Sequence, residues 1–141
     1  MKMNNMVLRD TIKSKSDQLN VDDLLGGDRM IQVEGVNIVN DPQQPIHIYY
    51  VGCNNVPYKP CLTVRRILIA LWGEDEHGQA SHWVGRWMNL YVDPTVSYGK
   101  QKNCGGIRVN AVSNIPNVAT VKATVKRGIK QEFKIQPITL S

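Results

Sequence analysis

The sequence predicts a mainly β fold: a small antiparallel barrel with one α-helix and an appended C-terminal β-hairpin. Three observations lead to this prediction. Several short runs alternate apolar and polar residues, only one run has helical periodicity, and the 141 residues are enough for one core. Apolar residues make up 42% and charged residues 21% of the chain, as in ordinary globular domains. We therefore expect a single folded domain.

The N-terminal third predicts an arm followed by a β-hairpin. Residues 1–18 are polar and rich in Lys, Asn and Ser, so we expect a flexible arm. After a short helical turn, residues 29–39 alternate in polarity and predict a strand with a bulge or bend at Gly35. The turn-forming residues 40–45 lead into a second strand over residues 46–51.

The middle of the chain contains the clearest helix. Residues 62–72 place their apolar side chains on one helical stripe, and Gly73 supplies a stop signal. Residues 83–92 predict a strand that is broken at Gly85. Residues 98–106, with three glycines, predict a loop.

The C-terminal part predicts three more strands. Residues 107–112 alternate in polarity and form the first of them. Residues 118–125 and 129–137 alternate on either side of a turn at Arg127 and Gly128, and together they predict a hairpin.

The order of these elements indicates the architecture. One helix cannot supply the crossovers that a doubly wound parallel sheet requires, so we expect an antiparallel sheet. When the short segment before the helix is counted as the third strand, the helix lies between the third and fourth strands. This order matches the oligonucleotide- and oligosaccharide-binding (OB) arrangement and predicts an OB-like barrel. We expect a flexible arm over residues 1–18, the OB-like barrel over residues 19–116, and a hairpin over residues 117–141 packed on the same domain.

The net charge of +5 is unevenly distributed. Residues 1–93 carry nine Lys or Arg against eleven Asp or Glu, whereas residues 94–141 carry eight against one. A basic C-terminal third favours encounters with polyanions such as nucleic acid. No apolar run approaches the ~18 residues of a membrane span, and we see no signal peptide. Three cysteines without a CxxC motif predict free thiols in the cytoplasm.

Several short motifs occur in a characteristic order. They are DDLLGG at residues 22–27, Trp72-Gly73, WVGRWMNLY at residues 83–91 and GGIRV at residues 105–109. With this layout the chain resembles a family of small phage and prophage proteins that share the pattern DLGG … WVGK-x-I-x-LY … G … IRV. The resemblance covers residues 19–112, and it implies a phage origin, an OB-like barrel, a host-cell cytoplasmic location and genes that often lie beside replication or recombination genes.

The sequence does not predict an enzyme. The histidines His47, His77 and His82 do not have the spacing of a zinc site, so we expect no metal. Neither Cys61 nor Cys104 has a histidine beside it in the sequence, as a cysteine nucleophile would favour. No phosphate-binding glycine motif is present, and we expect no cofactor.

Aromatic and basic residues interleave along the predicted barrel and hairpin. Proteins that bind single strands use cations to contact phosphates and flat rings to stack on bases, so this pattern predicts single-stranded DNA binding with little sequence preference. Only one of Tyr49 and Tyr50 is expected to face outward, because successive strand residues point to opposite faces. Trp72 and Trp83 are expected in the core. The predicted nucleic-acid-binding residues are Tyr49, Tyr58, Lys59, Arg65, Arg86, Trp87, Tyr98, Lys100, Lys102, Lys122, Lys126 and Arg127.

Two other functions compete with this prediction. The basic hairpin could present a sheet edge or a cationic surface to a host or phage protein, so that the chain binds or inhibits that partner. A barrel with polar arms also suits a structural component of a virion. Self-association into a homo-oligomer stays open, and no membrane partner is expected.

Overall fold

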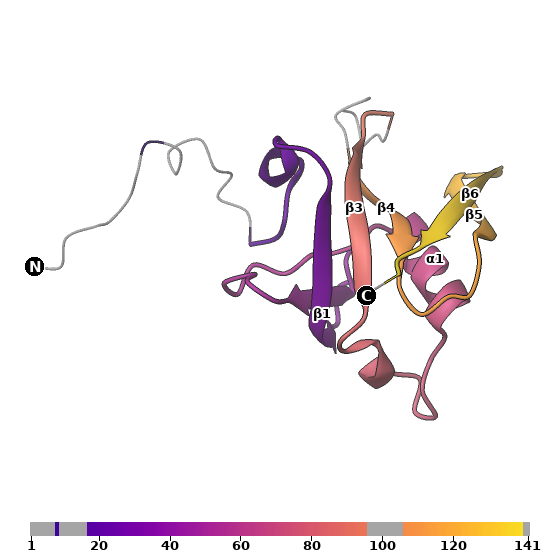
Figure 1. Ribbon diagram of the computed structural model, residues 1–141, viewed down its shortest axis with the longest axis horizontal. Helices are drawn as coiled ribbons and strands as arrows, with labels where there is room; N and C mark the ends of the chain where they lie inside the picture. Colours follow the sequence, from indigo (N-terminus) through magenta and orange to yellow (C-terminus); the bar gives the residue numbers. More distant parts are fainter. Residues whose placement is uncertain (1–7, 9–16, 96–105, 140–141) are drawn as a thin grey trace, which may run out of the picture.

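The computed structural model describes residue 8 and residues 17–95 and 106–139. Within these residues the chain is mainly β, with one α-helix, and this coarse prediction is confirmed (Figure 1). The elements in chain order are η2 (Val21–Leu24), β1 (Arg29–Ile38), β2 (Ile46–Tyr50), α1 (Leu62–Trp72), η3 (Ser81–Trp83), β3 (Trp87–Asp93), β4 (Gly106–Val112), β5 (Ala119–Lys126) and β6 (Ile129–Pro137).

The strands form one six-stranded sheet with the order β2-β1-β3-β4-β6-β5. In the described part of the chain, β2 and β5 lie at the two edges and do not pair with each other, so the sheet is not closed. An isolated antiparallel bridge joins Ile48 of β2 to Tyr58.

The prediction of an entirely antiparallel sheet is wrong at one pairing. β4 and β6 run parallel, with Ala111 opposite Gln136 and Val112 opposite Pro137. A parallel pair needs a long connection between its strands. Here β5 and its flanking turns supply that connection: β5 runs along the outer edge, and β6 returns between β5 and β4.

Glycines set two of the boundaries that the sequence predicts. The register of β1 against β2 shifts between Val33 and Gly35, which confirms the bulge. Gly73 ends α1 with φ of 71°, and its N–H donates to the Ile69 carbonyl at 2.8 Å. The predicted strand over residues 83–92 starts later, at Trp87, because Gly85 with φ of 89° turns the chain after η3.

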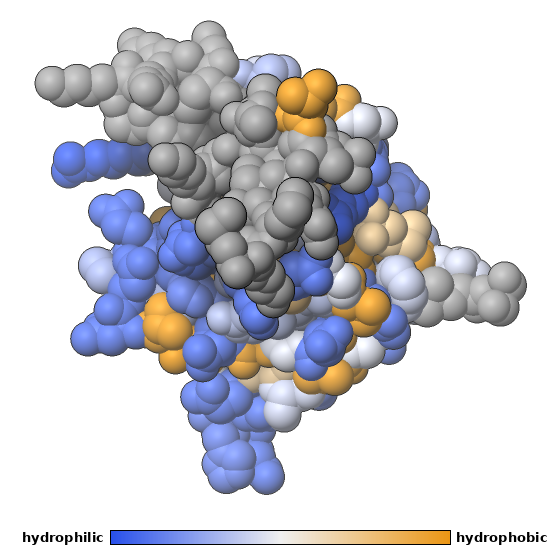
Figure 2. All heavy atoms as spheres, turned by 90° about the vertical axis from the view of Figure 1, so that its left-hand side faces the viewer, coloured by the Kyte–Doolittle hydropathy of each residue, from blue (hydrophilic) through white to orange (hydrophobic). Residues whose placement is uncertain are grey.

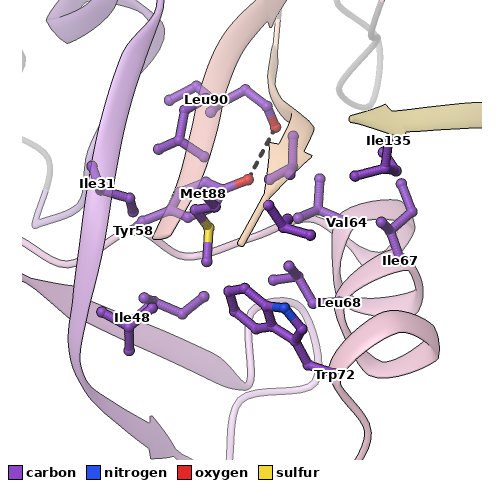
Figure 3. Close-up of a cluster of buried hydrophobic side chains, with 14 of the residues drawn as sticks. Ile31, Ile48, Tyr58, Val64, Ile67, Leu68, Trp72, Met88, Leu90 and Ile135 are labelled. Atoms are coloured by element: carbon purple, nitrogen blue, oxygen red, sulfur yellow. Dashed lines mark hydrogen bonds between the residues drawn. The ribbon is translucent and has the colours of Figure 1, made fainter. Parts of the chain in front are cut away.

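The core lies between α1 and the inner face of the sheet (Figure 3). Buried side chains of α1 meet those of β1, β2 and β3, and burial of each such side chain contributes about 1.5–3 kcal/mol. The residues at this contact are Val64, Ile67, Leu68 and Trp72 of α1 and Ile31, Ile48, Met88 and Leu90 of the sheet.

Two tryptophans close one end of this core. The rings of Trp72 and Trp83 meet edge to face with their centroids 5.4 Å apart. Trp72 Nε1 donates to the Ser113 carbonyl and Trp83 Nε1 donates to the Gly73 carbonyl, each at 2.9 Å. The prediction that both rings belong to the core is confirmed.

Candidate nucleic-acid interface

The β5–β6 hairpin separates apolar from charged side chains by simple alternation. Val121 pairs with Phe133, and both are buried against the domain. Lys122 pairs with Glu132 on the opposite side of the hairpin, and both are exposed. Because strand residues alternate between faces, the outer face of the hairpin is polar, while its inner face is apolar and packs against the domain. We call the exposed cations of this hairpin the hairpin surface: Lys122, Lys126, Arg127, Lys130 and Lys134.

The hairpin surface is strongly positive. Residues 119–137 carry five Lys or Arg and one Glu, a net charge of +4. Lys122 Nζ lies 3.7 Å from Glu132, and a pair this exposed contributes at most about 1 kcal/mol. Among the described residues, no acid lies within ion-pair distance of the other four cations. These four are therefore available to an external anion.

Helix α1 adds a cation to the tip of the hairpin. Arg66 Nη1 donates to the Thr124 carbonyl at 3.3 Å, and Thr63 Oγ1 donates to the same carbonyl at 3.2 Å. Arg66 is exposed, and the chain reaches Lys126 two residues after Thr124. The helix thus fixes the hairpin and extends its positive surface.

The predicted aromatic residues differ in exposure. Tyr49 is partly exposed and Tyr50 is buried, which confirms that only one of them faces outward. Tyr58 is buried, with its hydroxyl donating to the Ile107 carbonyl at 3.2 Å (Figure 3), so its ring offers no stacking face. Trp87 is partly exposed on the outer side of β3.

Tyr91 lies on the same side of β3 as Trp87, and the sequence reasoning missed it. The two residues are four apart in one strand and therefore share a face. The two-residue alternation of a strand could have placed Tyr91 beside Trp87 from the sequence alone. Burial, together with the nearby Asp93 carboxylate, raises the pKa of the Tyr91 phenol.

Three predicted cations serve the fold rather than an open surface. Lys59 is nine-tenths buried and forms an ion pair with Asp17 at 3.1 Å. Arg65 Nη2 donates to the Gln43 carbonyl at 3.3 Å, and burial lowers the pKa of the Arg65 guanidinium. The Arg86 guanidinium lies over the Trp72 ring, 5.5 Å from its centroid.

Three other predicted residues, Tyr98, Lys100 and Lys102, lie outside the described residues. Cys104 lies there too, while Cys53 and Cys61 are free thiols.

The register connects the ring of β3 with the hairpin surface. Asn89 of β3 pairs with Met30 of β1 and with Ala111 of β4, and Ala111 pairs with Gln136 of β6. Directly paired residues have their side chains on the same side of a sheet. Trp87 is two residues from Asn89, and Lys134 is two residues from Gln136, so the tryptophan ring and Lys134 lie on one side of the sheet. By alternation along β6 and pairing with β5, Lys130 and Lys122 lie on this side too. Tyr49 lies on β2, at the opposite edge from the hairpin (Figure 1).

The side of the molecule that faces away from the β5–β6 hairpin shows an ordinary solvated surface. Figure 2 looks at the side where β1 lies, and hydrophilic residues cover most of its described part, with small separate hydrophobic patches between them. Scattered apolar residues of this kind are normal on a folded protein.

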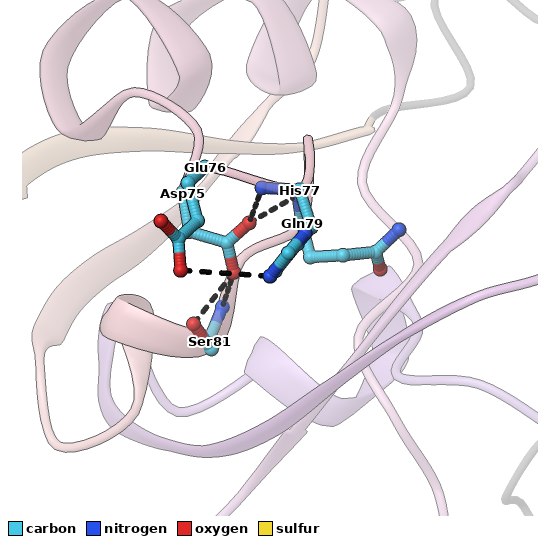
Figure 4. Close-up of polar contacts among 5 residues, drawn as sticks. All are labelled: Asp75, Glu76, His77, Gln79 and Ser81. Carbon is cyan, nitrogen blue, oxygen red and sulfur yellow. Dashed lines mark hydrogen bonds and ion pairs between the residues drawn. The ribbon is translucent and has the colours of Figure 1, made fainter.

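The charged turn between α1 and η3 contains Glu74, Asp75, Glu76 and His77, which are residue types that bind metals. In the structure, Asp75 accepts hydrogen bonds from the backbone of His77 and Gln79 at 2.9 Å and from the Ser81 hydroxyl at 2.6 Å (Figure 4). These bonds use the carboxylate to close the turn. In the described part of the chain, no group of three His, Cys, Asp or Glu side chains is arranged to hold a metal ion.

Asp75→Asn is expected to make stability less dependent on pH. The hydrogen bonds from Ser81 and then from Gln79 hold the pKa of the Asp75 carboxyl far below its usual range. A lowered folded-state pKa stabilises the fold above the unfolded pKa of about 4, and this contribution is lost as the pH falls through the folded pKa. Melting curves at pH 7 and pH 2.5 should show the wild type more stable than the variant at pH 7, with a smaller gap at pH 2.5. An equal gap at both values would contradict the role given to the carboxylate.

Comparisons with protein-family models, with curated proteins and with solved structures find no match to this chain. Among the described residues, no helix is long and apolar enough to cross a membrane.

Proposed function

We propose that this protein binds single-stranded DNA with little sequence preference, without catalysing a reaction. The hairpin surface contacts the phosphates, and the half-exposed rings of β3 contact the bases. The proposal includes an OB-like barrel of the phage type that the sequence motifs resemble.

The strand connections support the OB-like part of the proposal. β1 pairs with both β2 and β3, and β3 pairs with β4, so four strands follow a barrel order. The Ile48 to Tyr58 bridge stands where the third of five barrel strands is expected, and α1 follows it directly. OB folds are five-stranded and only partly closed, so an open seam beside the third strand is compatible with them.

The observation that carries the function is the common side of the sheet shared by Trp87 and three of the hairpin cations, Lys122, Lys130 and Lys134. A single strand lying across this side would meet cations at β5 and β6 and an aromatic ring at β3. Each phosphate neutralised by Lys or Arg releases bound counterions, which favours binding whatever the sequence. Each base stacked on a ring adds about 1–3 kcal/mol, and every base has a flat face, so the preference for sequence is small.

A salt titration with a labelled single-stranded oligonucleotide tests this function. We expect the four hairpin cations without an ion-pair partner to contact one phosphate each. Each such contact on a single strand contributes about −0.7 to the slope of log binding constant against log salt concentration, so the total slope should be about −3. The duplex of the same sequence is the control, and it should bind more weakly because its bases are not free to stack. Absence of binding to the single strand at about 50 mM salt would contradict the proposal.

A further inference from the structure

Residues 17–24, which we call the strap, lie along the segment that precedes α1. The Leu19 N–H donates to the Pro57 carbonyl at 2.9 Å, and the Leu19 side chain is only 5% exposed. Gln44 Nε2 donates to Gln18 Oε1 at 2.9 Å. Figure 1 shows the strap as the indigo segment that leads into β1. The strap is therefore fixed to the domain by one backbone bond, two buried leucines, Leu19 and Leu24, and one amide pair.

The ion pair at the start of the strap is asymmetric. The Lys59 side chain is 10% exposed, whereas the side chain of its partner Asp17 is 85% exposed. A nearly buried ammonium group requires an anion or hydrogen-bond acceptors, because it has lost most of its water. The hydrogen bond and the positive charge of Lys59 lower the pKa of Asp17, so that this carboxylate is ionised at neutral pH. The nearly buried Lys59 ammonium therefore depends for its counter-charge on the exposed Asp17 carboxylate.

Lys59 also faces a hollow of about 450 Å³ beside the strap. Tyr58 and Ile107 form one part of its wall, where the barrel seam is not paired. Asn20 and Gln44, which have amide side chains, line it as well, and so does the exposed Asp22. A cation next to amide groups suits a phosphate group, which accepts several hydrogen bonds.

The hollow is connected to the hairpin surface through α1. Cys61 lines the hollow and is also the N-cap residue directly before α1. Arg66, in the second turn of the same helix, contacts Thr124 of β5. The first two turns of α1 therefore link Lys59 to the tip of the hairpin.

We propose that Lys59 and this hollow form a phosphate subsite for the bound strand, and that Asp17 occupies it in the free protein. The proposal rests on the DNA-binding function proposed above and adds a means of regulation to it. Asp17 acts as a competitor inside the same chain: a phosphate group replaces the Asp17 carboxylate at Lys59, and the exposed Asp17 side chain turns away while residues 18–24 stay in place. The apparent affinity for DNA is then the intrinsic affinity multiplied by the fraction of molecules in which Asp17 does not occupy Lys59.

The test compares Asp17→Asn with a control of the same charge change. Glu34→Gln also removes one negative charge, and Glu34 is exposed on β1 with no ion pair among the described residues. We expect Asp17→Asn to bind a labelled single strand about tenfold more tightly than Glu34→Gln, with a salt slope steeper by about 0.7. Adding Lys59→Gln to Asp17→Asn should remove this gain. Lys59→Gln alone should weaken binding, so the proposal stays testable if Asp17→Asn lowers the melting temperature.

The outcomes separate this proposal from the general function. If the wild type binds DNA but Asp17→Asn and Glu34→Gln behave alike, the subsite is wrong and the general function stands. If no variant binds DNA at about 50 mM salt, the general function fails and the subsite with it. If Asp17→Asn gains as much for poly-glutamate as for DNA, the site takes carboxylates of an acidic protein, and the assignment to phosphate is overturned.

Discussion

Replacing Lys126, Arg127 and Lys130 together by glutamine is expected to weaken DNA binding about 100-fold at ~0.1 M salt. These three cations are exposed at the tip of the hairpin, and no described acid neutralises them. Each lost phosphate contact should reduce the magnitude of the log–log salt slope by about 0.7, so the slope becomes shallower by about 2. Fluorescence anisotropy of a labelled single strand at a series of salt concentrations measures both quantities.

The matched control removes the same net charge elsewhere. Asn37→Asp, Gln43→Glu and Gln79→Glu introduce three negative charges at exposed positions away from the hairpin. If the control loses as much affinity as the hairpin variant, the net charge of the protein is responsible, and the hairpin surface is not the binding site.

Leu68→Ala is expected to destabilise the fold strongly. Leu68 is fully buried on the inner face of α1, and truncating a buried leucine costs about 2–5 kcal/mol through lost burial and the cavity left behind. Since domains of this size are stable by about 5–15 kcal/mol, this is a large share of the total. Urea unfolding followed by tryptophan fluorescence measures the loss.

Ile69→Ala provides the comparison on the same helix. Ile69 is 41% exposed, so its truncation should cost no more than about 1 kcal/mol. Equal losses for the two variants would mean that the burial assigned to the two faces of α1 is wrong.

Local periodicity was sufficient to predict most elements of this fold. α1 matches the predicted residues 62–72, and β6 matches the predicted residues 129–137, because apolar spacing and glycine stops act over a few residues. The pairing of β4 with β6 was beyond such reasoning. It depends on which strand docks against a distant one, and that choice is made by tertiary packing rather than by the pattern of either strand.

The candidate site was only partly predictable for a similar reason. Lys122, Lys126 and Arg127 are exposed as the hairpin alternation predicts. Lys59 and Tyr58 follow a segment without periodicity, and their surroundings come from the strap and from β4, far away in the sequence. A residue type alone therefore did not reveal that one cation was already paired and one ring already buried.

The hydrogen bonds that α1 donates to the Thr124 carbonyl have a consequence for aggregation. An edge strand with free backbone groups is a template on which another chain can add a strand, and proteins commonly protect such edges with lysines. On β5, α1 covers the carbonyl of Thr124, while Lys122 and Lys126 line the rest of the edge with positive charge. Two copies approaching edge to edge at β5 would repel each other, so we expect the same lysines to disfavour polymerisation through this strand.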